Sequence, residues 1–451
     1  MSLSERQLAD AAALSDALLR LTAIHSRVPG AAFGFSHDGA TILLGAHGLA
    51  DVEHAAPVDA VATAFRCASI TKSVTATLVM QLVERGKLRL DDAVTSLLPW
   101  TRQALDAELT VRHLLMHGGG VIRDGSNAWD DRSMPDREMF RAEVRAKAAF
   151  GLPSERFRYS NVAYSLLGEI VEASTRRSFV SLVNGNVVRP LGLTTTWPDL
   201  SSAARRHLAT GYQGSRPDEP RLPVPHVDAR AVAPAGGLIS TVPDLLEYQL
   251  AQLPGDGRLL TEYSKREMQR TQWLRSEEPN YGLGWMNWHI DGIKVVGHSG
   301  GYPGFVTKIA FSPDEGIAAA VLTNTESPAA ARGIELIYQS ISGVRRHWAD
   351  AAATTRWHGR ASLQPFVGLY RLRGSDLLVA RVNGSLHLVD HEEPSPLSKA
   401  ARLEPLGPRR FRIVTGDDFG FLGEDVTFTS DRRGRITTLH YGAHAYTKEQ
   451  I

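Results

Sequence analysis

The apolar positions in the first 90 residues predict a helix, a hairpin and a second helix. Apolar residues recur at spacings of three and four over residues 8–21, which predicts an amphipathic helix that ends near His25. Short β-type runs flank Asp38-Gly39, a pair that favours a hairpin because both residues tolerate positive φ. A further helical pattern covers residues 69–85, and Gly86 follows where a left-handed cap is favoured.

The middle of the chain predicts central helices and late strands. Helical spacing covers residues 110–116, 161–175, 242–253 and 329–352, and strand-like runs cover residues 294–297, 306–311 and 318–322. Residues 123–136 are polar and rich in Asp, which indicates a loop. This mixture indicates the α/β class for the first 352 residues.

Beyond Phe366 the pattern changes to short alternating runs separated by Gly, Asn and Asp. These runs are LYRL, LLVARV, SLHLVD, FRIVT, DVTFTS and RITTLHY. They predict an all-β module of about 85 residues, a small barrel. We therefore predict a first domain over 1–352, a linker over 353–363 and a β-barrel domain over 364–451.

Charge and composition exclude several functions. The 451 residues carry 50 Lys and Arg against 49 Asp and Glu, a formal charge of +1, which disfavours nucleic acid or an anionic membrane as the main partner. No stretch approaches the roughly 18 apolar residues that cross a bilayer, and the first 20 residues lack the apolar run of a secretory signal. Cys67 is the only cysteine, so neither an intramolecular disulfide nor a thiolate metal cage can form. These features predict a cytoplasmic protein.

The segment Ser69-Ile70-Thr71-Lys72 carries the sharpest chemical signal. Residues three apart on a helix share one face, so the Lys72 amine can reach the Ser69 hydroxyl. A serine hydroxyl is a poor nucleophile until a base takes its proton, and a lysine can do this only when it is neutral. Burial or a nearby cation would have to lower the pKa of Lys72. Alone, the usual interpretation of this spacing is a capping Ser and a solvated Lys.

Two further segments supply complementary groups. In FRYSNVAYSLLGEIVE, the Tyr159 phenol can relay a proton and Asn161 offers an NH₂ donor for a substrate carbonyl. An N-cap Asn161 and a core Tyr159 are the simpler alternative. In KVVGHSGGYPGF, the glycines after His298-Ser299 let a substrate lie against the backbone, where the amides of Gly301 and Ser69 can face an oxyanion. The alternative for Gly300-Gly301 is a turn between strands.

In this order the three segments resemble the serine β-lactamase and penicillin-binding-protein superfamily, with its S-x-x-K, Y-x-N and K/H-x-G motifs. The likeness spans about residues 28–325 and includes TVRHLLMHGGG and PAGGLISTVPDLLEY. It looks most similar to the class C-like branch, with its D-aminopeptidases, D-alanyl-D-alanine carboxypeptidases and carboxylesterases. The resemblance implies a β-lactamase/transpeptidase-like fold, an antiparallel sheet flanked by helices plus a helical subdomain. It also implies a C-terminal lipocalin-like barrel.

The resemblance also implies the roles of the site residues. Ser69 is then the acylated nucleophile, Lys72 and Tyr159 share the base and acid roles, and Asn161, His298, Ser299, Gly300 and Gly301 line the pocket and oxyanion site. No metal or organic cofactor is implied. His298 replaces the Lys that holds a substrate carboxylate in β-lactam-binding relatives, so a substrate without an obligatory carboxylate is expected. His117-Gly118-Gly119-Gly120 also replaces the usual His-Thr-Ser-Gly.

Rival motifs carry less weight. Residues 297–301 fit the G-x-S-x-G elbow of lipases, and HGGG at His117 resembles a lipase oxyanion loop. However, Pro303-Gly304 and VTKIAF predict a turn into a strand, whereas an elbow needs a helix. His113 and His117 stand four apart on one predicted helix and could bind a metal, but no Glu lies between them and no third ligand is evident. Cys67 is expected to be a buried small hydrophobe.

We therefore expect a serine hydrolase that forms an acyl-enzyme, most of all a peptidase or amidase for D-amino-acid-containing peptides. A carboxylesterase or weak β-lactamase of the same fold is the first alternative. The second is an inert binding or regulatory protein, disfavoured because all three catalytic elements keep their polar groups. The expected partner is a small-molecule or short-peptide substrate, with no nucleic acid and no membrane, and a homo-oligomer is left open.

Overall fold

The computed structural model describes residues 3–125, 134–214, 221–350, 362–372, 375–390, 393, 396, 398–415 and 422–449. The chain divides into two compact units: Ser26–Ile334, and Met1–His25 together with Glu335–Ile451. This division by contacts differs from the boundaries predicted at residues 352 and 364, which stay a proposal. Most of the predicted linker, and residues 126–133 of the predicted loop, lie outside the described residues.

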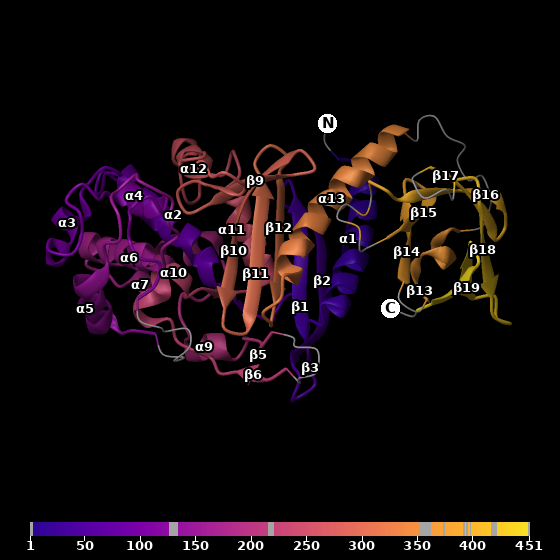
Figure 1. Ribbon diagram of the computed structural model, residues 1–451, viewed down its shortest axis with the longest axis horizontal. Coiled ribbons are helices and arrows are strands. Elements are labelled where there is room, and N and C mark those ends of the chain that lie inside the picture. The colour runs from indigo at the N-terminus through magenta and orange to yellow at the C-terminus, as the bar shows by residue number, and fades with distance from the viewer. Residues whose placement is uncertain are drawn as a thin grey trace. The chain divides into compact units, whose positions relative to one another are not determined.

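An antiparallel sheet forms the centre of the unit Ser26–Ile334, as Figure 1 shows. In the described part of the chain it has eight strands in the order β3-β2-β1-β12-β11-β10-β9-β8. The bounds are β1 Gly30–His37, β2 Ala40–Asp51, β3 Ala56–Pro57, β8 Asn280–Tyr281, β9 Met286–Ile290, β10 Ile293–Tyr302, β11 Phe305–Ser312 and β12 Ile317–Thr323. The first strand pairs with the last, since Ala31 lies opposite Thr323. The predicted α/β class is confirmed, as is the hairpin at Asp38-Gly39.

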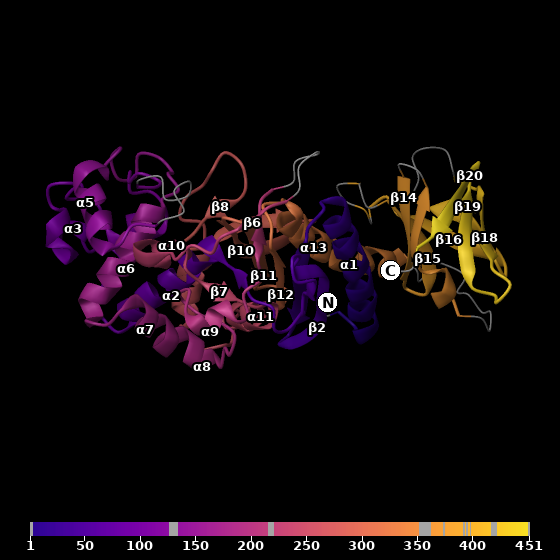
Figure 2. The same cartoon turned by 90° about the horizontal axis from the view of Figure 1, so that it is seen from below.

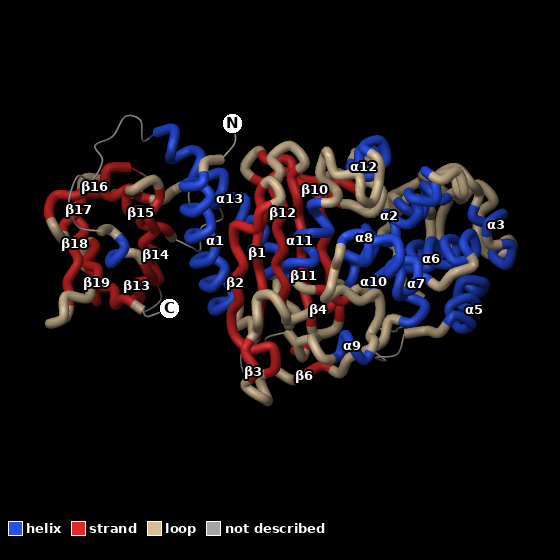
Figure 3. Tube along the Cα trace, turned by 180° about the vertical axis from the view of Figure 1, so that it is seen from behind, coloured by secondary structure: helices blue, strands red, loops and turns tan. Residues whose placement is uncertain are grey.

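Helices of the same unit cover one face of the sheet and gather beside it, as Figure 3 shows. Helix α11 (Val242–Leu250) contacts β1, β11 and β12, and α2, α6 and α10 pack against one another. The other helical bounds are α2 Thr71–Glu84, α3 Val94–Leu97, α4 Val111–Leu115, α5 Arg137–Lys147, α6 Asn161–Thr175, α7 Phe179–Val183, α8 Arg189–Leu191, α9 Ser202–Arg205, α10 Ala233–Gly236 and α12 Glu262–Gln269. The helical subdomain implied by the resemblance is present.

Short elements complete this unit and help to place the site. The two-residue strand pairs are β4 Phe65–Arg66 with β7 Ile239–Ser240 and β5 Gly211–Tyr212 with β6 Pro223–Val224. The short helical turns are η1 Ala68–Ile70, η2 Pro99–Thr101, η3 Asn184–Val188 and η4 Arg230–Val232. The pairing of β4 with β7 anchors the chain just before η1, and η1 leads directly into α2.

The helices that carry the site begin and end for local reasons. Helix α6 begins at Asn161 because the Ser160 hydroxyl accepts a hydrogen bond from the Ala163 N–H at 2.8 Å. It ends at Thr175, after which Arg176 adopts a left-handed φ of 56°. Helix α2 is buried from Thr71 to Leu82, as expected for a helix that forms part of the core.

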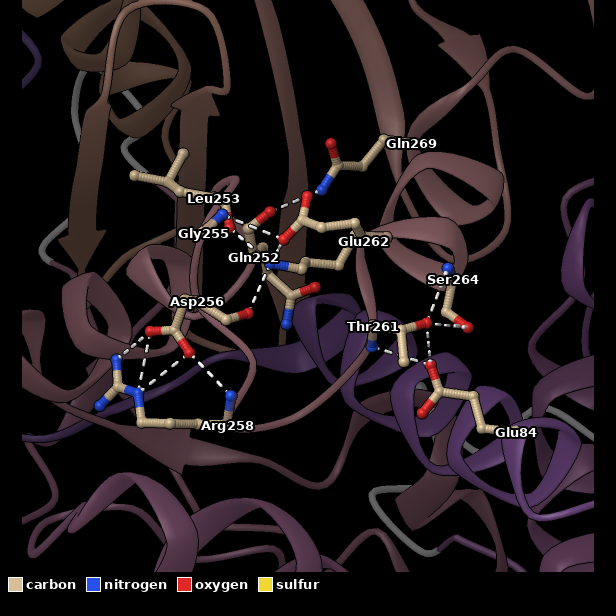
Figure 4. Close-up of polar contacts among 11 residues, drawn as sticks. Glu84, Gln252, Leu253, Gly255, Asp256, Arg258, Thr261, Glu262, Ser264 and Gln269 are labelled. Atoms are coloured by element: carbon tan, nitrogen blue, oxygen red, sulfur yellow. Dashed lines mark hydrogen bonds and ion pairs between the residues drawn. The ribbon is translucent and has the colours of Figure 1, made fainter.

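Polar contacts join the end of α2 to the start of α12, as Figure 4 shows. The Thr261 hydroxyl accepts from the Ser264 N–H at 3.4 Å and so caps α12. The N–H and hydroxyl of Thr261 both donate to Glu84 Oε1, at 2.8 and 2.7 Å. In the preceding loop, Arg258 Nε donates to Asp256 Oδ2 at 2.9 Å. These contacts tie the end of α2 to α12 and so help to hold the residues at its other end.

The unit made of Met1–His25 and Glu335–Ile451 contains the C-terminal barrel, whose strands are seen in Figure 2. In the described residues β13 to β20 close into a barrel, which confirms the predicted all-β module. The bounds are β13 Gly368–Leu372, β14 Ser375–Val382, β15 Ser385–Val389, β16 Ala401–Gly407, β17 Arg410–Thr415, β18 Asp425–Ser430, β19 Ile436–Tyr441 and β20 His444–Lys448, with η6 at Gln364–Phe366.

Side chains fill the barrel. The Phe366 ring lies 5.3 Å from that of Phe411 and 4.9 Å from that of Phe428, within one buried apolar cluster. Helix α1 (Glu5–His25) packs on β14, where the Asn383 N–H donates to Asp10 Oδ2 at 2.7 Å. Helix α13 covers Ala329–Asp350. None of the described helices is long and apolar enough to cross a membrane.

Candidate active site

Ser69 lies in a sharp turn at the start of α2. The preceding residue, Ala68, has a φ of 48°, a left-handed conformation that costs energy for a residue with a Cβ. Ala68 and Ile70 are buried, whereas Ser69 is partly exposed. The turn therefore presents one hydroxyl to solvent from an otherwise buried segment, as an attacking nucleophile requires.

The Lys72 amine is fully buried and touches three oxygens. Its Nζ lies 2.9 Å from Ser69 Oγ, 2.7 Å from Asn161 Oδ1 and 2.8 Å from Ala235 O. The amide of Asn161 is fixed in this orientation because its Nδ2 donates to Asp124 Oδ1 at 2.6 Å. Asn161 Oδ1 and Ala235 O can only accept, so they take the two protons of a neutral amine. The remaining lone pair of Lys72 then faces the Ser69 hydroxyl.

Burial explains why this amine can be neutral. Removal from water lowers the pKa of Lys72 well below its usual value. The Asp124 carboxylate opposes this effect, and the Arg123 guanidinium adds to it. A neutral amine 2.9 Å from a serine hydroxyl is placed to act as a general base.

Tyr159 lies on the other side of the nucleophile. A hydrogen bond joins its hydroxyl to Ser69, and burial raises the pKa of the phenol. Its ring centroid lies 4.9 Å from Lys72 Nζ and 5.6 Å from the Arg123 guanidinium carbon. Burial therefore shifts the two pKa values in opposite directions, which suits the phenol to donate a proton and the amine to accept one.

The strand β10 carries the third predicted segment. Gly300 packs against the nucleophile turn, since a Cβ there would lie 2.1 Å from Cys67 O. A Cβ on Gly301 would meet nothing within 4 Å, so this exposed residue borders open space. Ser299 is partly exposed. The strand therefore runs beside the turn that holds Ser69, and its backbone at Gly301 borders space that no other atoms fill.

His298 is fully buried, and both of its ring nitrogens are bonded within the protein. Its Nδ1 lies 2.6 Å from Ser299 O and its Nε2 lies 3.0 Å from the Tyr281 hydroxyl. Burial lowers the pKa of His298 to about 3. The ring is therefore neutral and has no N–H left for a substrate carboxylate.

The structure brings together Ser69, Lys72, Tyr159 and Asn161, and it places His298 behind the site wall instead of in the pocket. The Asn161 amide donates one proton to Asp124 and keeps its second N–H, so its predicted donation to substrate stays a prediction. The structure also differs from one expectation. His113 and His117 do not share a helix, because α4 ends at Leu115 and His117 has a φ of 60°.

The rival motifs have structural explanations. Residues 297–301 lie within β10, which turns at Gly304 into β11, so this G-x-S-x-G segment forms no nucleophile elbow. Gly120 has a φ of 63°, and a Cβ there would lie 2.1 Å from Gly151 O. A glycine is therefore needed at this position because the two backbone segments pack closely together. Cys67 is buried, as expected. No group of three or more metal-ligating side chains occurs among the described residues.

Sequence reasoning missed Asp124, Arg123 and Tyr281. Asp124 sets the orientation of the Asn161 amide, Arg123 lies over the Tyr159 ring, and Tyr281 bonds to His298. Each contact joins residues that are at least 17 positions apart, beyond one helical turn or hairpin, so a single sequence carries no local signal for such pairs.

A partly exposed serine beside a fully buried lysine, set against an antiparallel sheet, is the arrangement expected of a serine hydrolase. The chain belongs to the β-lactamase family, whose model matches residues 10–340. It is 31% identical over 318 residues to penicillin-binding protein 4 of Amycolatopsis lactamdurans, which covers 66% of this chain and 81% of that protein. The superfamily resemblance found in the sequence is thereby confirmed.

Solved structures agree with this assignment. The D-stereospecific amidohydrolase of a Streptomyces species is 27% identical, with a TM-score of 0.62 over 73% of this chain and 98% of that one. SurE is 26% identical, with a TM-score of 0.61 over 97% of this chain and 99% of that one. SurE has also been solved with D-Leu, at a TM-score of 0.58. These findings support a hydrolase of the serine β-lactamase type.

Proposed function

We propose that the protein hydrolyses amide or ester bonds through an acyl-enzyme on Ser69, and that its substrates are peptides or amides that contain D-amino acids. One observation carries the catalytic part of the proposal. The buried Lys72 Nζ lies 2.9 Å from Ser69 Oγ and also contacts Asn161 Oδ1 and Ala235 O, two oxygens that can only accept. A neutral amine donates its two protons to these oxygens and directs its lone pair at the Ser69 hydroxyl.

The reaction follows from this geometry. Lys72 takes the proton of Ser69 as Oγ attacks the substrate carbonyl carbon, and the amides of Ser69 and Gly301 stabilise the oxyanion. The C–N or C–O bond then breaks, Tyr159 protonates the leaving group, and Lys72 returns its proton to Tyr159. In the second half a water molecule attacks the acyl carbonyl. Lys72 takes one proton from that water and gives it back to Ser69 Oγ, which releases the acid and restores the enzyme.

Two observations support the substrate class. Neutral His298 offers no charge or N–H for a substrate carboxylate, which disfavours β-lactams and carboxypeptidase substrates. The Streptomyces amidohydrolase is D-stereospecific, and SurE has been solved with D-Leu.

The test compares D- and L-phenylalanine amide, p-nitrophenyl acetate and a chromogenic β-lactam by turnover and by intact mass of the acyl adduct. We expect hydrolysis of the D-amide over the L-amide and an adduct on Ser69 that Ser69→Ala abolishes. Ser299→Ala should keep substantial activity; the opposite pattern would assign the nucleophile to Ser299. Preferred turnover of the ester or the β-lactam would favour the esterase or β-lactamase alternative. No labelling by a fluorophosphonate would favour the binding protein.

The predicted cytoplasmic location and the homo-oligomer remain proposals. Cell fractionation tests the first, and size-exclusion chromatography with light scattering tests the second.

A further inference from the structure

Three buried side chains join the two walls of the candidate site. His117 follows α4, Tyr281 lies in β8 and His298 lies in β10, and each is at most 1% exposed. The Tyr281 hydroxyl lies between the two imidazoles, 3.1 Å from His117 Nε2 and 3.0 Å from His298 Nε2. A fully buried polar row of this kind is stable only when each member finds a partner.

The main chain at each end fixes where the protons lie. The Ser160 N–H can only donate, so His117 Nδ1, 3.1 Å away, must accept, and the single proton of this neutral ring is on Nε2. Ser299 O can only accept, so His298 Nδ1, 2.6 Å away, carries the proton of that ring. Tyr281 has one proton. The Tyr281 hydroxyl therefore accepts from His117 Nε2 and donates to His298 Nε2. The donors then all point the same way along the row, from His117 to Ser299 O.

The surroundings keep both rings neutral. Burial lowers the pKa of His117 well below its usual value. Tyr164 also packs here, with its ring centroid 5.1 Å from that of His117. Its hydroxyl donates to Leu115 O at 2.7 Å, so in its hydrogen bond with the Tyr281 hydroxyl it can only accept, and it adds no proton to the row.

The two ends of the row lie next to the residues that the proposed reaction uses. Ser160 stands between Tyr159 and Asn161, and the His117 ring contacts the Tyr159 ring at 4.3 Å between centroids. Ser299 precedes Gly300 and Gly301 on β10. The row therefore spans from the segment with the phenol to the strand with the second oxyanion donor.

We propose that His117, Tyr281 and His298 form a directional hydrogen-bond relay that sets the position of Tyr159 relative to the oxyanion donors on β10. His117 and Tyr281 are then positioning residues that touch no substrate. This role rests on the acyl-enzyme function proposed above. Because the transition state needs the phenol and the oxyanion donors in place together, a broken relay lowers kcat more than it raises KM.

Tyr281→Phe tests the relay because it removes only the hydroxyl. We expect kcat to fall about 10- to 100-fold on p-nitrophenyl acetate while KM stays within about twofold. Tyr370→Phe is the matched control in the barrel, since the buried Tyr370 hydroxyl likewise donates one bond, to Phe366 O at 2.7 Å. Its kcat should equal that of the wild type. Equal losses in the two variants, or a Tyr281→Phe kcat within twofold of wild type, would overturn the relay.

A second measurement does not depend on the variant folding or on turnover. In ¹⁵N-histidine NMR of the wild-type protein, His117 should carry its proton on Nε2 and His298 on Nδ1, both neutral at pH 6. The opposite tautomers, or a charged ring, would overturn the relay. If the tautomers are as assigned and no ester or amide is turned over, the relay stands as structure and the proposed function fails.

Discussion

Replacing Gly300 with Ala should separate the strand that carries Gly301, the proposed oxyanion donor, from the turn that carries Ser69, the proposed nucleophile. A Cβ at this position would lie 2.1 Å from Cys67 O and 2.6 Å from Thr307 Oγ1. Thr307 is held in place because its hydroxyl donates to Cys67 O at 3.3 Å. Since ordinary contact begins at 3.4 Å, β10 and η1 must move apart by about 1.3 Å.

The size of the effect follows from this displacement. A misplacement of roughly 1 Å costs about 100-fold in rate, which equals about 2.7 kcal/mol of transition-state stabilisation. Overpacking also lowers the free energy of unfolding by about 1–3 kcal/mol. We therefore expect kcat/KM for p-nitrophenyl acetate to fall about 100-fold in Gly300→Ala, with a lower melting temperature.

Gly257→Ala is the matched control, because a Cβ there meets nothing within 4 Å. It should keep wild-type kinetics and melting, measured by ester hydrolysis and by circular dichroism. A Gly300→Ala protein with more than about a third of wild-type kcat/KM and unchanged melting would show that this contact does not set the geometry of the site.

Turnover should rise with pH along an acid limb, because Lys72 acts when neutral and burial brings its pKa well below the usual value. Lys72→Ala should be nearly inactive and lack this limb, and a flat wild-type profile would contradict the base assignment. Iodoacetamide should spare Cys67 in the folded protein, because the thiol is buried and burial raises its pKa. The denatured chain should be alkylated, and intact-mass spectrometry measures alkylation of the folded and of the denatured protein. Phe366→Ala should destabilise the barrel by about 3–5 kcal/mol in denaturant unfolding, and a loss below about 1 kcal/mol would refute its packing role.

Local patterns predicted the elements that position the nucleophile. The periodicity over residues 69–85 predicted α2, which begins at Thr71, so Lys72 lies in its first turn and Ser69 in the preceding turn η1. Ser160-Asn161 marked the start of α6, because capping acts over one turn. Pro303-Gly304 likewise predicted the turn between β10 and β11 correctly. Helix α5 was missed because its first turns follow a polar stretch that indicated a loop.

The features that the sequence did not predict, such as the partner of His117 and the orientation of the Asn161 amide, depend on contacts between distant segments. The spacing of His113 and His117 suggested one helix face, but the helix ends between them and His117 instead bonds to Tyr281, 164 residues away. The orientation of the Asn161 amide depends on Asp124, 37 residues earlier. Such pairs are set by tertiary packing, which periodicity and propensity do not encode.

The pairing of β1 with β12 also affects biosynthesis. Ala32 lies opposite Leu322, so the middle of the sheet joins residues 290 positions apart. Contacts of such separation form late, because the loop they close is long. A nascent chain that has not yet emerged from the ribosome as far as β12 leaves β1 and β11 with unpaired edges in the centre of the sheet. This interval of translation is when chaperone binding would most reduce aggregation.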